Sequence, residues 1–321
     1  MPSAPVRWTL TAIFLIAIGL ALALPWQGVS AEVLATLRGP RVLAGVVVGA
    51  LLALSGLALQ VLLRNPLADP YVLGTSGGAA VGAIATQSLG GAFGGALGAG
   101  VLGTVSMGVG AALGALAAGL ALLGLARGAL RAREDDASSR LILTGAMLAA
   151  VSGAVGTLLL TLTPDQRLRG AIFWLVGDLS GAADAAWALP VVLLATAYFV
   201  WRARAVDRLL LGTEVAWLLG EPVRRLRHEL LALACLATAC AVSLAGAVGF
   251  VGLVVPQALR LAGVRGTRQL AWMSAAGGGA LVALADALAR SVAWPLELPV
   301  GAVMALLGAP VFIAFLARGP R

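Results

Sequence analysis

The ionisable and nucleophilic side chains of this sequence are few, and their types exclude most enzyme chemistry. All 22 Lys and Arg residues are arginines, and the only histidine is His228. A P-loop ATPase needs a lysine to bind phosphates, and Schiff-base catalysis needs a lysine amine. Ser76 or Ser139 could be proposed as a nucleophile, but no convincing base accompanies either one. We therefore expect no catalytic residue, no metal site and no cofactor in this chain.

The carboxylates lie near the ends of the long apolar runs, not in their middles. The ones that bear on function are Asp69, Asp178, Asp184, Asp286 and Glu297. An ion-coupled secondary transporter usually keeps ionisable residues near the bilayer midplane as a relay. Such a transporter, acting alone, is therefore the weaker hypothesis. A transporter of this composition would take its driving force from a partner.

The most informative motif is Arg-Asn-Pro-Leu-Ala-Asp-Pro at residues 64–70, between two apolar runs. Proline removes a backbone donor and pushes the residue before it out of the helical region, so Asn65 and Asp69 should be non-helical. Non-helical backbone near a membrane is tolerated only where protein or water satisfies it. We interpret the motif as part of a pathway or gate; the alternative is a simple turn. A glycine-rich run that ends at Pro256 and Gln257 mirrors it in the C-terminal half.

The composition determines which elements must position these residues. The chain has 321 residues, of which 60% are hydrophobic and 11% charged, and its mean hydropathy is +0.99. These values predict an all-α polytopic membrane protein that forms one domain over residues 1–321. Spans of about 20 apolar residues place ten helices near 8–25, 41–63, 71–89, 94–126, 140–163, 184–201, 229–249, 251–263, 270–289 and 298–317. An internal repeat of about 41–163 and 229–317 is a further hypothesis.

The arginines indicate how the spans are oriented. With a cytoplasmic N-terminus, 17 arginines fall in inner segments and five in outer ones. This bias follows the positive-inside rule and predicts that both termini are cytoplasmic. Because the positive-inside rule explains the net charge of +8, we expect no nucleic-acid partner.

Two charged regions could contact other proteins. The inner loop at about 202–228 contains apolar residues in a pattern that suits a short amphipathic helix. This helix could lie on anionic membrane lipid or could dock a cytoplasmic subunit. On the outer side, Arg38, Arg41 and Arg290 could form an exposed basic rim for a soluble partner. The alternative for Arg290 is an ion pair with Asp286, four residues earlier on the same helix.

Several segments, in the right order along nearly the whole chain, resemble the FecCD-type permease subunits of binding-protein-dependent ABC importers for iron-siderophores, haem and cobalamin. They are residues 38–41, 51–56, 64–70, 173–181, 249–256, 285–286, 297–301 and 307–310. The family usually carries histidine after the proline of the glycine-rich motif, whereas this chain has Gln257.

The resemblance implies a type II ABC importer permease in the bacterial cytoplasmic (inner) membrane. It implies a homodimer of two permease copies, two cytoplasmic ATPase subunits that carry ATP and Mg, and a periplasmic or lipid-anchored substrate-binding protein. Of the possible cargoes, iron-siderophore is favoured over haem and cobalamin because iron-chelate members are the commonest in the family.

The resemblance also assigns roles to individual residues. The cytoplasmic gate would comprise Asn65, Leu67, Ser138 and Ser139. The ATPase coupling site would comprise Glu214, Ala216 and Gly220, and the binding-protein docking site would comprise Arg38, Arg41 and Arg290.

Overall fold

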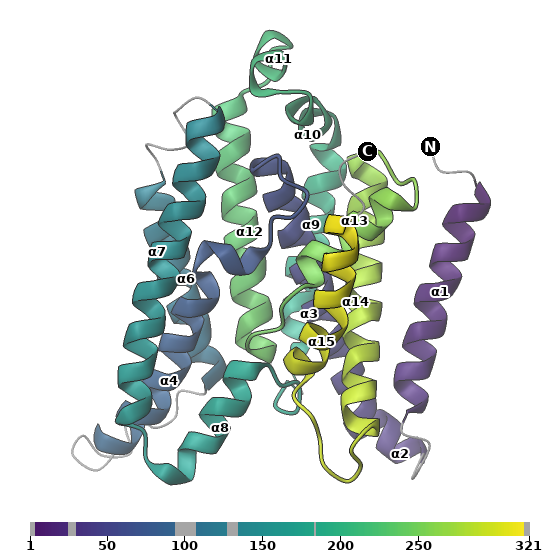
Figure 1. Ribbon diagram of the computed structural model, residues 1–321. Coiled ribbons are helices and arrows are strands. Elements are labelled where there is room, and N and C mark those ends of the chain that lie inside the picture. The colour runs from purple at the N-terminus through teal and green to yellow at the C-terminus, as the bar shows by residue number, and fades with distance from the viewer. Residues whose placement is uncertain (1–3, 25–29, 94–106, 127–133, 183, 318–321) are drawn as a thin grey trace.

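The long apolar runs form the helices of a bundle (Figure 1). The computed structural model describes residues 4–24, 30–93, 107–126, 134–182 and 184–317, and the elements within these ranges are all helical. The α-helices are α1 (Ala4–Ala23), α2 (Ala31–Val33), α3 (Gly39–Leu62), α4 (Thr75–Phe93), α6 (Met107–Leu125), α7 (Glu134–Thr161), α8 (Asp165–Val176), α9 (Leu189–Trp201), α10 (Ala203–Leu210), α11 (Thr213–Leu218), α12 (Val223–Ala245), α13 (Val251–Leu261), α14 (Thr267–Ser291) and α15 (Val300–Ala317). A π-helix, η1 (Leu34–Arg38), and two 3-10 helices, η2 (Pro70–Leu73) and η4 (Ala185–Ala188), complete the described elements.

The predicted all-α class is confirmed, while the number of membrane crossings stays a prediction. Five described helices are long and apolar enough to cross a membrane, or six if α9 and α10, which meet at 65°, share one span. Three further apolar helices are shorter than these. Of the expected helix at 94–126, residues 94–106 lie outside the described residues, and the remainder contains α6.

Helix α8 was missed by the sequence reasoning. Its first turns contain the charged residues Asp165, Arg167 and Arg169, so the segment is not a continuous apolar run. The signals that could have found it are local: Pro164 precedes its first residue and Gly177, with φ of 92°, follows its last. Proline at a helix start and glycine just after a helix end are typical boundary residues.

Helix α3 is the centre of the bundle, and glycines allow its neighbours to approach closely. A Cβ atom added at Gly49 would lie 2.0 Å from the carbonyl oxygen of Gly278 in α14. One added at Gly56 would lie 2.1 Å from the carbonyl oxygen of Gly252 in α13. Backbone contact at such distances is possible only without side chains. These glycines therefore determine how α13 and α14 pack on α3.

Glycines also let α4 pack closely against α6. A Cβ atom at Gly82 would lie 2.0 Å from the carbonyl oxygen of Gly110 in α6, and one at Gly78 would lie 2.5 Å from that of Gly114. The α4–α6 pair thus has the small-residue interface that membrane helices use.

The segments predicted to be inner and outer separate to opposite ends of the bundle. Helices α10 and α11 lie at one end together with the start of α1, whereas α2 and α8 lie at the other end (Figure 1). We call these the α11 end and the α8 end.

Candidate functional site

The motif at 64–70 ends α3 and turns the chain back into the bundle. Arg64 has a positive φ of 48°, which terminates the helix. The side-chain oxygen of Asn65 accepts a hydrogen bond from the Leu67 amide at 2.9 Å, and its carbonyl accepts one from the Ala68 amide at 3.1 Å. The Asp69 carboxylate then accepts from the Tyr71 amide at 2.9 Å at the start of η2. Asn65 and Asp69 are non-helical, as predicted.

The four expected gate residues, two in this motif and two in α7, differ in their exposure. Asn65 is exposed and Leu67 is half-buried. Ser138 is half-buried and Ser139 is exposed, and both belong to the first turns of α7. Their assignment to a gate stays a prediction.

The glycine-rich run of the C-terminal half meets the first motif directly. The chain leaves α12 at Gly246, with φ of 64°, and enters α13 after Phe250, with φ of 68°. Between them, the amide of Val248 donates a hydrogen bond to the hydroxyl oxygen of Tyr71. The two interruptions that the sequence shows 177 residues apart are thus one joined feature.

Gln60 extends this junction toward the end of α13. Its side-chain nitrogen donates to the carbonyl of Gly252 at 3.0 Å, and its oxygen accepts from Arg260 at 2.5 Å. Gln257, which stands where the family usually has histidine, is half-buried, and its side-chain oxygen has no hydrogen-bond partner among the described residues. No local pattern marks Gln60, a polar residue within an apolar helix, because the partners described above lie 192 and 200 positions later.

The loop predicted at 202–228 contains two short helices, α10 and α11. The expectation of a single amphipathic helix was therefore wrong. Gly212, with φ of 132°, separates α10 from α11, because this backbone conformation interrupts a helix. Glu214 and Gly220 are exposed, whereas Ala216 is buried and packs inward. Gly220 has φ of 80° and turns the chain out of α11.

Helix α11 presents an uncovered apolar surface. Trp217 is 70% exposed, Leu218 is 76% exposed and Leu219 is 52% exposed. The helix projects from its end of the bundle (Figure 1). A groove of about 1070 Å³ lies beside it, and the basic residues Arg224, Arg225 and His228 form part of its lining. We call Trp217, Leu218, Leu219 and this groove the α11 surface.

One polar contact closes the loop that contains α10 and α11, and another attaches it to α14. Arg208 in α10 pairs with Glu221 beyond α11 at 2.5 Å. The Asp207 carboxylate accepts from the backbone amide of Thr267 at 3.1 Å and from its hydroxyl at 2.5 Å, and so caps the start of α14. The sequence reasoning missed Asp207, because its partner lies 60 residues away.

The loop is also closed at its base. Arg202, at the end of α9, pairs with Glu229 of α12 at 3.2 Å, and the hydroxyl of Tyr198 donates to the same carboxylate at 3.0 Å. Helix α10 packs against α9, α12 and α14, and α11 packs against α10 and α12.

The three arginines expected on an exposed outer rim are paired inside the protein, and this geometry corrects that expectation. Arg290 is 7% exposed and donates to Asp286 at 3.0 Å, which is the helix-end ion pair named as the alternative. Arg41 pairs with Asp286 at 3.0 Å and with Glu297 at 2.8 Å. Arg38 is 6% exposed and donates to the carbonyl of Ala23 at 3.2 Å.

This cluster connects the ends of three helices. Arg38 and Arg290 both donate to carbonyls in the last residues of α1, while Arg41 and Asp286 join α3 to α14. Positive groups at the C-terminal end of a helix are favourable because of its dipole. The cluster therefore holds α1 against the bundle, and a role in docking a binding protein stays a prediction.

No metal centre is evident in the described part of the chain. Within those ranges, no group of three or more His, Cys, Asp or Glu side chains lies where it could hold an ion. The arrangement is instead that of a membrane bundle with a joined pair of helix breaks and an uncovered apolar surface at one end.

The fold and the order of these features agree with known proteins. The family model of the FecCD transport family matches residues 5–318. A solved structure reported as an inward-facing conformation of an ABC transporter assigned to the metal-chelate type superposes with a TM-score of 0.82 at 25% identity, covering 98% of this chain and 99% of that one.

Curated relatives are similar over most of their length. A cobalamin import system permease protein, BtuC, of Halobacterium salinarum is 40% identical over 307 residues, which are 94% of this chain and 78% of the relative. The ABC transporter permease protein YvrB of Bacillus subtilis is 38% identical over 90% of this chain and 80% of its own length. A vitamin B12 import system permease protein, BtuC, of Vibrio vulnificus is 36% identical over 97% of this chain and 95% of its own length. This chain therefore belongs to the FecCD transport family and is an ABC importer permease.

Proposed function

We propose that this chain forms the membrane pathway of an ABC importer for a cobalt corrinoid such as cobalamin, driven by cytoplasmic ATPase subunits that dock on the α11 surface. The observation that carries the proposal is the uncovered apolar face of α11, where Trp217 and Leu218 are 70% and 76% exposed. Large apolar patches rimmed by polar residues are typical of protein–protein interfaces. The fixed attachment of α10 and α11 to α9, α12 and α14 provides a route for a partner's movement into the bundle.

The cargo is inferred from relatives. The sequence reasoning favoured iron-siderophore, but two of the similar permeases described above are named for cobalamin or vitamin B12 import. Cobalamin, which was the alternative, is therefore the better supported cargo. Iron-siderophore and haem remain the competing substrates of the same transport class.

The partners follow from the family. We propose a dimer of two permease copies, a binding protein at the α8 end and two ATPase subunits at the α11 end, which places the α11 end and both termini in the cytoplasm. The arginine bias of the sequence supports this orientation.

The docking role can be tested with paired tryptophan variants. Trp217 lies on α11, and Trp272 is a 56% exposed tryptophan on α14. We expect Trp217→Ala to weaken association with the ATPase subunits and to reduce ATP-dependent uptake, because interface tryptophans often dominate binding. Trp272→Ala is the matched control and should leave both properties unchanged. Equal behaviour of the two variants would contradict the docking role.

A backbone variant and a charge-reversal variant test the same surface. Gly220 has φ of 80°, which proline cannot adopt, and Glu214 is exposed. We expect Gly220→Pro or Glu214→Arg to abolish uptake while the permease stays folded, as judged by its elution from a size-exclusion column. Normal uptake and normal coupled ATP hydrolysis in both variants would show that the coupling site lies elsewhere.

The cargo is tested by competition. Complexes reconstituted with their ATPase subunits and binding protein would be given radiolabelled cobalamin in the presence of excess unlabelled cobalamin, ferric siderophore or haem. Only unlabelled cobalamin should compete. Competition by the siderophore alone would overturn the cargo assignment but not the docking role.

A further inference from the structure

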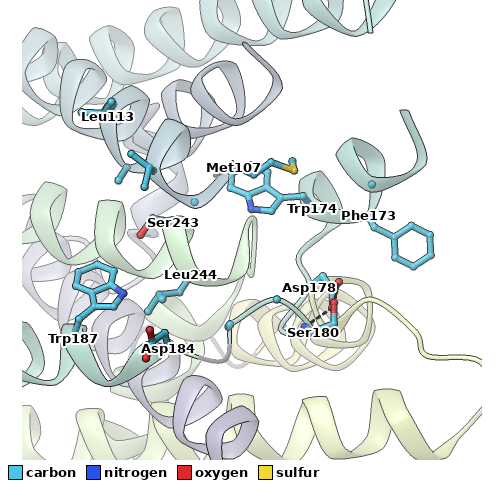
Figure 2. Close-up of a pocket in the computed structure, with 16 residues that line it drawn as sticks. Met107, Leu113, Phe173, Trp174, Asp178, Ser180, Asp184, Trp187, Ser243 and Leu244 are labelled. Atoms are coloured by element: carbon cyan, nitrogen blue, oxygen red, sulfur yellow. Dashed lines mark hydrogen bonds between the residues drawn. The ribbon is translucent and has the colours of Figure 1, made fainter. Parts of the chain in front are cut away.

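A pocket that the transport proposal does not use lies near the α8 end of the bundle. It has a volume of about 710 Å³ and is formed by α6, α8, the end of α12 and the segment that leads into α9. This volume is in the range of roughly 300–1,000 Å³ that is typical of small-molecule sites. Figure 2 shows Met107 and Trp174 next to each other on one side, with Trp187, Leu244 and Ser243 on the other.

The pocket opens on a surface that suits acyl chains. On α6, Val109 and Leu113 line the pocket and are 50% and 61% exposed. The next exposed leucines of α6, Leu116 and Leu120, continue the same apolar face along the helix. Because α6 is one of the helices long and apolar enough to span a membrane, such a face lies against lipid. The pocket is thus a recess in a lipid-facing surface.

Tryptophan and carboxylate side chains also line the recess. Trp187 is 52% exposed, and amphipathic tryptophan rings are enriched at the level of lipid headgroups. Asp184, also in the lining, is exposed and makes no hydrogen bond or ion pair with the described residues. Asp178 lines the same pocket, and its carboxylate accepts from the amide of Ser180 at 2.9 Å and from its hydroxyl.

The charges around the recess select one class of headgroup. Two carboxylates at the pocket repel an anionic headgroup and attract an ammonium group. A headgroup that carries an ammonium group therefore suits the recess better than an anionic one.

We propose that the pocket binds a phosphatidylethanolamine molecule, with one acyl chain between α6 and α12 and the ammonium at Asp184. This proposal needs only the membrane location of the chain and does not rest on the identity of the cargo or on ATPase docking. A second copy of this chain is the competing occupant. However, the recess is concave, and Asp184 has no partner within the described chain. Both features fit a lipid headgroup better than the flat surface of a second protein copy.

Native mass spectrometry of the detergent-purified chain with added phosphatidylethanolamine or phosphatidylglycerol tests the proposal. Ala112 lines the pocket, and Ala117 is an exposed residue of the same helix that does not. We expect the wild type to bind phosphatidylethanolamine at least about tenfold more tightly than phosphatidylglycerol, a difference of about 1.4 kcal/mol. Ala112→Trp should remove this binding, whereas Ala117→Trp should retain it.

A second variant keeps the test decisive if Ala112→Trp does not fold. Asp184→Asn alters an exposed side chain and should lower the preference for phosphatidylethanolamine over phosphatidylglycerol without loss of thermal stability. Equal binding of the two lipids by the wild type, or an unchanged preference in Asp184→Asn, would overturn the proposal. A change from dimer to monomer in Ala112→Trp would instead identify a second copy as the occupant.

Discussion

The ion-pair cluster at the α8 end offers a prediction whose magnitude follows from burial. Asp286 is 1% exposed and accepts from both Arg41 and Arg290, whereas the carboxylate of Glu297 is 51% exposed and, within the described ranges, pairs only with Arg41. Removing one member of a buried pair costs about 3–5 kcal/mol, because the remaining charge is left buried and uncompensated. Asp286→Ala should cost about 3 kcal/mol, at the lower end of this range, since Arg41 keeps Glu297.

Glu297→Ala is the matched control, because it removes a carboxylate from the same arginine at an exposed position. Exposed pairs contribute about 0–1 kcal/mol, so this variant should denature close to the wild-type temperature. The measurement is thermal denaturation of the purified permease in detergent, followed by size-exclusion chromatography. If Asp286→Ala is no less stable than Glu297→Ala, the cluster does not hold α1, α3 and α14 together. In that case the arginines would be available for the docking role.

Three further predictions concern the joined helix breaks. Tyr71→Phe removes the acceptor of the Val248 amide and should destabilise the permease by about 1–3 kcal/mol; a melting temperature equal to that of the wild type would show that the two breaks are not held together by this bond. Burial raises the pKa of Asp69, which lies in the linker between α3 and η2, to about 6, so the protein should lose stability as the pH rises from about 4 to about 6. Asp69→Asn keeps an acceptor for the Tyr71 amide and should show a smaller change in melting temperature over that interval; an unchanged pH profile would refute the assignment. Asn65→Ala and Leu67→Ala should alter substrate leak or coupling more than assembly, as measured by efflux from loaded proteoliposomes; if both variants transport normally, the motif is only a turn.

Much of the fold could be predicted because membrane helices are encoded locally. An apolar run of sufficient length must satisfy its own backbone in lipid and so becomes a helix, and Pro66 and Pro70 mark the end of α3 by removing donors. Gly78 and Gly82 of α4 are four residues apart, a spacing that places them on one helical face. Helix α8 was missed because it carries charge and its start and stop signals are short.

The parts that could not be predicted depend on contacts between distant residues. The pairing of Tyr71 with Val248, and that of Asp207 with Thr267, depend on how the helices pack, which no local pattern records. Arg290 shows the difference clearly. Its pairing with Asp286 was foreseeable from the four-residue spacing, but its contact with the end of α1 required the structure.

A passive pathway driven by partner ATPases should transport nothing without them. The most direct measurement is uptake of radiolabelled cobalamin into proteoliposomes that contain the permease either alone or assembled with its ATPase subunits and binding protein. We expect uptake only in the assembled complex and only with ATP. Uptake by the permease alone under a proton or sodium gradient would contradict it.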